Sequence, residues 1–180
     1  MMIKRAGVED LALRLATPPD APALAEIHVS AWHEAYRGIV PEPTLEQFTV
    51  EGRTRRFREF LADPSAETYV AEHDSRIVGF LTLGGCRDAD LQRGSTGEIW
   101  GIYILPEYWR RGIGRFLCEQ GQSMLASRDF AIATLWVLEA NLPARRFYEA
   151  MGFKSDGATK ELTLGIPLTA IRYRKNLGSS

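Results

Sequence analysis

The residues best suited to chemistry gather in the stretch 98–117, where two glycines follow an apolar segment. The segment 98–105 is apolar and partly β-branched, which favours a strand, and Pro106 ends it because proline cannot donate to a strand ladder. Gly112 and Gly114 come next, and the apolar residues after them return at helical spacing, as Ile113, Phe116, Leu117 and Met124. A loop between a strand and a helix directs backbone N–H groups and the positive end of the helix dipole at one point. The stretch therefore predicts a site for a phosphate or a pyrophosphate.

Two common glycine-loop motifs do not fit this stretch. A P-loop ends in Gly-Lys-Ser/Thr, whereas this loop has Gly-Arg-Phe at that place. A dinucleotide-binding fingerprint needs a third glycine, and Leu117 occupies its position. An ordinary strand-to-helix turn remains as the alternative on this stretch alone. Arg110, Arg111 and Arg115 surround the loop with positive charge, which favours the anion site.

The loop resembles the pyrophosphate loop of the GNAT superfamily of acyl-CoA-dependent N-acetyltransferases. The family pattern is Gln/Arg-x-x-Gly-x-Gly/Ala, and residues 109–114 match it except at Trp109, where the family usually has Arg or Gln. A second match lies downstream, where Asn141 precedes Tyr148 by seven residues and a Gly-Phe pair closes the segment at 152–153. This segment resembles the family's fifth strand and the helix after it. The resemblance covers about residues 11–174, nearly the whole chain.

The expected order of elements is that of the GNAT fold. The resemblance implies an α+β fold with a mixed, mostly antiparallel sheet of about seven strands and about four helices. Its fourth and fifth strands are expected to be parallel and splayed. Residues 1–10 are expected to form an N-terminal extension, 11–175 the domain and 176–180 a tail. The expected strands cover 11–16, 68–72, 77–83, 98–105, 131–138, 153–159 and 168–174, and the expected helices cover 17–36, 44–62, 113–127 and 141–151.

The resemblance implies acetyl-CoA as the cosubstrate. A splay would leave backbone N–H and C=O groups of the central strand unpaired, and each buried unpaired group costs ~1–3 kcal/mol. We therefore expect the pantetheine arm to bond to the central strand and the pyrophosphate to lie on the loop amides. The residues implied for the cofactor are Ile102, Tyr103, Ile104, Arg110, Arg111, Gly112, Ile113, Gly114, Arg115, Asn141 and Phe147.

The resemblance also implies direct attack by an amine on the acetyl thioester. A lysine-like amine has a pKa of about 10 and must lose its proton, so Glu98 is the candidate base. Strand alternation predicts Glu98 on the same face as Trp100 and Ile102, and a solvated charge at the strand entrance is the alternative. An amide near Ile102 is expected to stabilise the developing oxyanion. Tyr148 is the candidate acid for the departing thiolate, whose pKa is roughly 8.5 by analogy with cysteine; a purely packing tyrosine is the alternative.

The first expected helix carries aromatic residues that could line the acceptor site. Trp32 and Tyr36 are interpreted as this wall, with ordinary core packing as the alternative. For Asn141, plain helix capping is the alternative to cofactor binding.

His28 and His33 lack partners at metal-ligand spacing, so no metal is expected. A row of arginines on the second expected helix is interpreted as a solvated face rather than a substrate patch, namely Arg53, Arg55, Arg56 and Arg58.

Composition narrows the functional classes. The chain has 180 residues, 45% hydrophobic and 25% charged, as in one ordinary globular domain. A net charge of −1 gives no basic field for nucleic acid, and two cysteines are too few for a disulfide framework or a metal cluster. No apolar run is long enough to cross a membrane and no signal core is evident, so a cytoplasmic location without membrane partners is expected.

The combined prediction is an N-acetyltransferase that acts on a primary amine of a small molecule or a protein. A non-catalytic acyl-CoA-binding sensor is the alternative. A homodimer formed through the last strands is compatible with the sequence, although no particular residue supports it.

Overall fold

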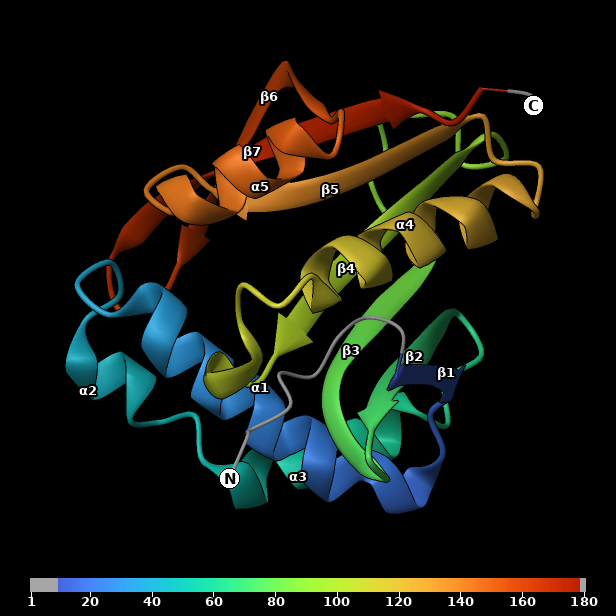
Figure 1. Ribbon diagram of the computed structural model, residues 1–180. Coiled ribbons are helices and arrows are strands. Elements are labelled where there is room, and N and C mark those ends of the chain that lie inside the picture. Colours follow the sequence, from blue (N-terminus) through green and yellow to red (C-terminus); the bar gives the residue numbers. More distant parts are fainter. Residues whose placement is uncertain (1–9, 179–180) are drawn as a thin grey trace.

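The computed structural model describes residues 10–178, which form a seven-stranded mixed sheet with helices on both faces (Figure 1). The strand order is β1-β2-β3-β4-β5-β7-β6. The strands are β1 (Leu11–Leu15), β2 (Ala66–His73), β3 (Arg76–Gly85), β4 (Thr96–Ile104), β5 (Ile132–Leu138), β6 (Lys154–Thr163) and β7 (Pro167–Asn176). The α-helices are α1 (Ala21–Tyr36), α2 (Glu42–Leu45), α3 (Val50–Phe60), α4 (Ile113–Ala126) and α5 (Leu142–Ala150). The predicted α+β class and the seven strands are confirmed.

The pair β4 and β5 is parallel, and it parts early. Its ladder contains the residue pairs Thr96–Ile132, Gly97–Ala133 and Glu98–Thr134. Beyond Glu98 and Thr134, β4 continues to Ile104 and β5 continues to Leu138, but the two strands no longer pair with each other. The other strand pairs of the sheet are antiparallel. The predicted splay between the fourth and fifth strands is therefore confirmed.

Helices cover the two faces of the sheet with different parts of the core. On one face α4 packs closely, because a Cβ added at Gly121 would lie 3.2 Å from the Leu81 side chain of β3. On the other face Leu24 and Ile27 of α1 pack against Phe80. Phe80 and Leu81 are neighbours in β3, so strand alternation places α1 and α4 on opposite sides.

The second predicted helix, 44–62, is wrong as a single element. The structure has a one-turn α2 and a separate α3, so residues 10–178 contain five α-helices rather than four. Thr49 separates them because its backbone is extended, with φ −87° and ψ 150°. Its side chain accepts a hydrogen bond from the Gly52 N–H at 3.2 Å and caps α3.

A β-bulge in β4 changes which side chains share a face. Thr82 of β3 pairs with Gly101, but Leu83 pairs with Ile99, so Trp100 is an extra residue in β4. Glu98 and Trp100 lie on the α3 side, whereas Ile102 packs into the core beneath α4. The expectation that Glu98 shares a face with Ile102 is wrong because the bulge reverses the alternation.

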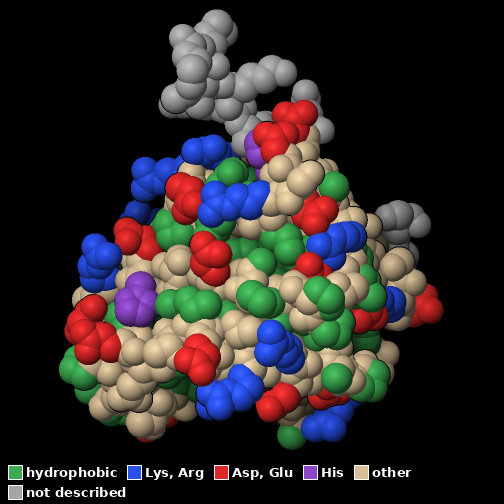
Figure 2. All heavy atoms as spheres, turned by 90° about the horizontal axis from the view of Figure 1, so that it is seen from below, with side chains coloured by type: hydrophobic (Ala, Val, Ile, Leu, Met, Phe, Trp, Pro, Cys, Tyr) green, Lys and Arg blue, Asp and Glu red, His purple; other side chains and the backbone are tan. Residues whose placement is uncertain are grey.

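The predicted ends of the domain can be compared with the structure only in part. Strand β7 reaches Asn176, one residue into the predicted tail, while most of the predicted extension lies outside the described residues. The face drawn in Figure 2 has hydrophobic side chains at its centre and basic and acidic side chains interspersed around them. Among the described helices, none combines the length and apolar character needed to cross a membrane.

Candidate active site

The N-terminus of α4 presents free backbone N–H groups. Gly112 precedes the helix in the left-handed conformation, with φ +85°, and no side chain caps this end. The first helical hydrogen bond runs from the Phe116 N–H to the Gly112 C=O at 3.0 Å. The amides of Ile113, Gly114 and Arg115 precede that bond, so they have no partner within the helix. Because Gly112 is exposed to solvent, an anion can reach these amides.

The predicted arginines lie around this helix end. Arg110 and Arg111 form no ion pair with any carboxylate of residues 10–178, and Arg111 lies over the Tyr108 ring at 4.9 Å. Arg115 pairs loosely with Glu119, at 3.4 Å, one helical turn away. The loop therefore keeps a positive field next to the unbonded amides.

The free edge of β4 lies beside this loop. Leu105 N–H bonds to a β3 carbonyl at 2.9 Å. Since backbone groups of successive strand residues point to alternate sides, those of Ile104 and Ile102 face the gap toward β5. The backbone of Tyr103 instead belongs to the ladder with β3, and its side chain lines the cleft. Of the three predicted strand contacts, two therefore present backbone groups to the gap.

Trp109 occupies the position at which the loop departs from the family pattern. Its indole Nε1–H donates to the Ile104 carbonyl at 2.8 Å. The side chain is 37% exposed and lines the cleft between the strands. This contact was not predicted from the sequence, because it depends on the fold of the short turn Pro106–Tyr108 between the two residues.

The gap between β4 and β5 is a cleft of about 190 Å³. Side chains of α1, β4, β5 and α5 line it, so the cleft is where the first and last helices meet the splayed strands. It brings together the predicted residues Trp32, Tyr36, Ile102, Tyr103, Ile104, Asn141 and Tyr148.

Tyr148 extends from α5 into this cleft. Its ring lies 5.0 Å from Phe147 and 6.0 Å from Phe153, centroid to centroid. Its hydroxyl forms no hydrogen bond within the described part of the chain. Burial raises the pKa of Tyr148 above its usual value, with smaller contributions from nearby ionisable groups, Cys118 first among them. The phenol therefore stays protonated at neutral pH and can donate.

Asn141 lines the cleft, whereas Phe147 is not among its lining residues and packs beside the start of α4. The Asn141 side chain accepts a hydrogen bond from the Ala144 N–H at 3.2 Å. It therefore caps α5, which is the alternative role that the sequence analysis named for Asn141. Its side chain also lies next to Tyr36 in the cleft. Phe147 packs beside the α4 N-terminus, where a Cβ at Gly114 would lie 3.5 Å from its ring.

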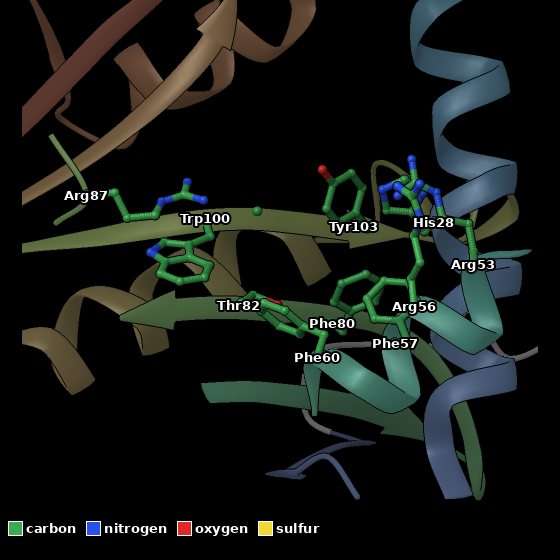
Figure 3. Close-up of a pocket in the computed structure, with 11 residues that line it drawn as sticks. His28, Arg53, Arg56, Phe57, Phe60, Phe80, Thr82, Arg87, Trp100 and Tyr103 are labelled. Atoms are coloured by element: carbon green, nitrogen blue, oxygen red, sulfur yellow. The ribbon is translucent and has the colours of Figure 1, made fainter. Parts of the chain in front are cut away.

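A second cavity, of about 390 Å³, lies between α1, α3, β3 and β4 (Figure 3). It meets the cleft at Trp100, Gly101 and Tyr103, which line both. Most of the residues that line this cavity were not identified from the sequence. The remaining lining residues are His28, Arg53, Arg56, Phe57, Phe60, Phe80, Thr82 and Arg87.

Glu98 is buried, with 1% of its surface exposed, and lines neither cavity. Arg87 engages both oxygens, through its backbone N–H at 3.0 Å from Oε2 and its Nη2 at 2.5 Å from Oε1. The guanidinium lies 4.1 Å from the centre of the Trp100 ring. The buried carboxylate thus holds Arg87 at the cavity wall, and the base role of Glu98 stays a prediction.

His28 is the cavity residue with the most unusual environment. Its ring stacks on Trp32 at 5.2 Å and lies 4.7 Å from Tyr103. Burial, and then the charge of Arg53, lowers the pKa of His28 to about 3, so the imidazole is neutral. The spacing of four residues between His28 and Trp32 is the sequence signal that places both on one helix face.

Unpartnered polar atoms mark the same two cavities. Within residues 10–178, the buried side-chain nitrogens or oxygens without a hydrogen-bond partner are His28 Nδ1, Trp32 Nε1 and Trp100 Nε1. Each of these residues lines one or both cavities. Buried polar groups are rarely left unpaired, so these atoms point to a ligand or to ordered water. No group of three or more metal-binding side chains occurs in the described range.

Comparisons with known proteins agree with this geometry. The family model described as the acetyltransferase (GNAT) family matches residues 32–153. The uncharacterized N-acetyltransferase YuaI of Bacillus subtilis is 30% identical over 91% of this chain and 98% of the relative. A mycothiol acetyltransferase of Thermobispora bispora is 33% identical over 77% of this chain and 50% of its own.

Solved structures share the fold. The PaiA N-acetyltransferase of Thermoplasma acidophilum, in complex with coenzyme A, has a TM-score of 0.74 at 20% identity, covering 92% of this chain and 98% of its own. YncA of Salmonella typhimurium, solved with its cofactor acetyl-CoA, has a TM-score of 0.69 at 18% identity, covering 94% and 95%. The splayed strands, the open helix N-terminus and these matches agree: the chain belongs to the acetyltransferase (GNAT) family, a family of acyltransferases.

Proposed function

We propose that this protein transfers the acetyl group of acetyl-CoA to a primary amine of a small molecule or a protein, by direct attack. One observation carries the proposal: β4 and β5 part after Glu98 beside an uncapped helix N-terminus. A cleft with a free strand edge at one side and unbonded amides at its end matches a ligand that has amides and a diphosphate. Two solved proteins of the same fold contain coenzyme A or acetyl-CoA, which supports the choice of ligand.

The residues of this chain fit such a ligand. The amides of Ile113, Gly114 and Arg115 are free to bind the diphosphate, and Ile102 and Ile104 offer backbone groups to the pantetheine amides. When bound, acetyl-CoA supplies an acyl carbon that bonds to the amine nitrogen as the C–S bond breaks, so one proton leaves the nitrogen and one reaches the sulfur.

In this proposal Tyr148 holds the proton that the sulfur takes up. Its hydroxyl reaches the cleft, has no protein partner among the described residues, and keeps its proton because burial raises its pKa. Glu98 can act as the base when Arg87 frees one of its oxygens, and water in the open cavity is the second route for the proton. Trp32 and Tyr36 bound the acceptor side of the cleft.

Replacing Tyr148 tests the acid role. General acid catalysis contributes about 10²–10⁴-fold, so Tyr148→Phe should lower kcat by about that factor while the Kd for acetyl-CoA stays the same. The assay is release of the CoA thiol with a panel of amines, across pH 6 to 9. Tyr69→Phe, on β2 and away from the cleft, is the matched control.

Two results would contradict the proposal. Unchanged turnover of Tyr148→Phe at every pH would remove Tyr148 from the mechanism. Tight acetyl-CoA binding by the wild type without thiol release with any amine would favour a non-catalytic acyl-CoA sensor instead.

A further inference from the structure

The cavity under α3 opens onto the place where the acetyl group would react. Trp100, Gly101 and Tyr103 belong to both this cavity and the cleft between the splayed strands. A molecule in the cavity can therefore extend its amine to the β4 bulge without crossing the sheet. Its volume of about 390 Å³ lies in the range of small-molecule sites.

The walls of the cavity are aromatic. Phe57 and Phe60 of α3, Phe80 of β3 and Trp100 of β4 face it from different elements (Figure 3). Phe57 and Phe80 meet edge to face at 5.5 Å, and Phe60 lies 5.9 Å from Trp100. Such walls favour a ligand with an aromatic or branched apolar body.

The charges of the cavity are unbalanced. Arg53 and Arg56 form no ion pair with any carboxylate in the described range, and Figure 3 shows them beside His28 at one end of the cavity. Burial first, and then the neighbouring charge of Arg56, lowers the pKa of Arg53. Arg87, at the other end, is already paired with Glu98. Two guanidiniums without a carboxylate partner in the described range, the half-buried Arg53 and the exposed Arg56, therefore lie at this end of the cavity.

We propose that the acceptor is a small amine that carries a carboxylate and an aromatic or branched apolar body, as an aromatic amino acid does. Arg53 and Arg56 bind the carboxylate, the phenylalanine rings and Trp100 enclose the body, and the amine lies toward Gly101. This inference rests on the proposed acetyl transfer and specifies its acceptor.

The same arrangement accounts for two further features. The guanidiniums disfavour the ammonium form of an amine near them, which promotes the neutral form that attacks. The unpartnered imidazole nitrogen of His28, in the same wall, offers a hydrogen-bond partner to the ligand. A polycationic amine, by contrast, would meet three guanidiniums in this cavity.

Three small molecules separate the contributions of the carboxylate and of the apolar body to binding. L-Phenylalanine has both the carboxylate and the apolar body, phenethylamine lacks only the carboxylate, and glycine lacks the body. Binding is measured by calorimetry with and without coenzyme A, and transfer by release of the CoA thiol from acetyl-CoA. We expect phenylalanine to bind at least about tenfold more tightly than either of the others, since a charge-assisted hydrogen bond contributes about a tenfold to hundredfold change in affinity.

Variants test the assigned arginines. The double variant Arg53→Gln with Arg56→Gln should weaken phenylalanine binding about tenfold to hundredfold, leave the affinity for acetyl-CoA unchanged and not weaken the binding of phenethylamine. Arg58→Gln, exposed on the same helix and absent from the cavity lining, is the control with wild-type affinities.

The outcomes distinguish this inference from the proposed function. Phenethylamine or glycine binding as tightly as phenylalanine, or a double variant with wild-type phenylalanine affinity, would overturn the inference. Thiol release with phenethylamine but not with phenylalanine would overturn it while supporting acetyl transfer. If acetyl-CoA does not bind at all, the proposed function fails, and calorimetry with phenylalanine alone still decides whether the cavity takes such a ligand.

Discussion

Glu98 and Arg87 form an ion pair whose two functions can be separated by a pair of variants. The carboxylate is buried, Arg87 covers both oxygens, and the guanidinium lies over the Trp100 ring. A base acts through the carboxylate alone, whereas a positioning role needs both partners. Removing each partner in turn therefore distinguishes the roles.

We expect Glu98→Gln and Arg87→Gln to lower kcat to a similar extent, within about threefold of each other, if Glu98 positions Arg87. A base role for Glu98 predicts a much larger loss in Glu98→Gln, about 10²-fold or more, together with loss of the acidic limb of the pH–rate profile. The measurement is the pH dependence of kcat and KM for both variants. A similar loss in both, with an unchanged profile, would leave water as the proton route.

His28 should make stability depend on pH. Burial first, and then Arg53, lowers its pKa to about 3 from an ordinary 6.5. Between these values the unfolded chain binds a proton that the folded chain does not, so stability falls as the pH drops below about 6.5. The loss is at most about 1.4 kcal/mol per pH unit.

Thermal unfolding between pH 7 and pH 5 tests this, since few carboxylates titrate there. His28→Phe keeps an aromatic ring among its neighbours and removes the titration, so its Tm should fall less steeply with acid than that of the wild type. Parallel Tm curves for the two proteins would show that another group carries the pH dependence.

At the scale of elements, Gly112 is the residue that gives the α4 N-terminus its shape. Its φ of +85° is strained for any side chain, so Gly112→Ala should cost about 1–2 kcal/mol, or roughly 2–8 °C in Tm. Because the strained turn presents the free amides of α4, the Kd for acetyl-CoA should rise at least about tenfold.

Gly157→Ala is the matched control. Gly157 has a similar φ of +88°, lies in β6 and has open space around its Cβ position. It should lose a similar amount of stability and keep wild-type acetyl-CoA affinity. Equal loss of affinity in both variants would mean that the effect comes from stability and not from the helix N-terminus.

The elements were largely predictable because their signals are local. Strand patterns, the proline after β4 and the glycine loop each depend on neighbours in sequence, and they predicted the sheet, α4 and the cleft. The break at Thr49 was missed because the apolar spacing on both sides resembles one helix. The bulge at Trp100 was missed because it depends on pairing with β3, which no local pattern encodes.

The contacts of the loop that carries Arg87 also could not be predicted from local sequence patterns. Arg172 of β7 is 5% exposed and bonds to Asp88 and Asp90 of the loop and to Asp156 of β6. Trp136 Nε1 also donates to Asp88 at 3.0 Å. These partners are far apart in sequence, so their ion pairs, and the cavity wall that they support, could not be predicted from spacing.

At the scale of the whole molecule, two cavities meet at one bulged strand. The cleft lies between β4 and β5, and the aromatic cavity lies under α3, so two ligands can approach the same three residues of β4 from different sides. The sequence predicted the first cavity from motifs, because most of the ligand contacts expected there are to backbone groups. The second is built from side chains of α1, α3 and two strands, whose meeting depends on the tertiary fold.

The tryptophans of the cleft should report ligand binding through their fluorescence. All four tryptophans of the chain line the cleft, namely Trp32, Trp100, Trp109 and Trp136. Ligand entry between the strands should therefore change the intrinsic fluorescence. Trp109 should contribute a large share, because its indole bonds to the Ile104 carbonyl at the free strand edge.

We expect acetyl-CoA to change the emission and to raise Tm by about 5–10 °C at a hundredfold excess over Kd, since binding there adds about 2.7 kcal/mol. Trp109→Phe should keep the Tm rise and lose part of the fluorescence change. ADP carries a diphosphate without a pantetheine arm, so it should reach the α4 N-terminus and alter the emission much less. An emission change with ADP as large as that with acetyl-CoA would contradict the proposed place of the arm between β4 and β5, because the proposal brings only the arm to Trp32, Trp100 and Trp136.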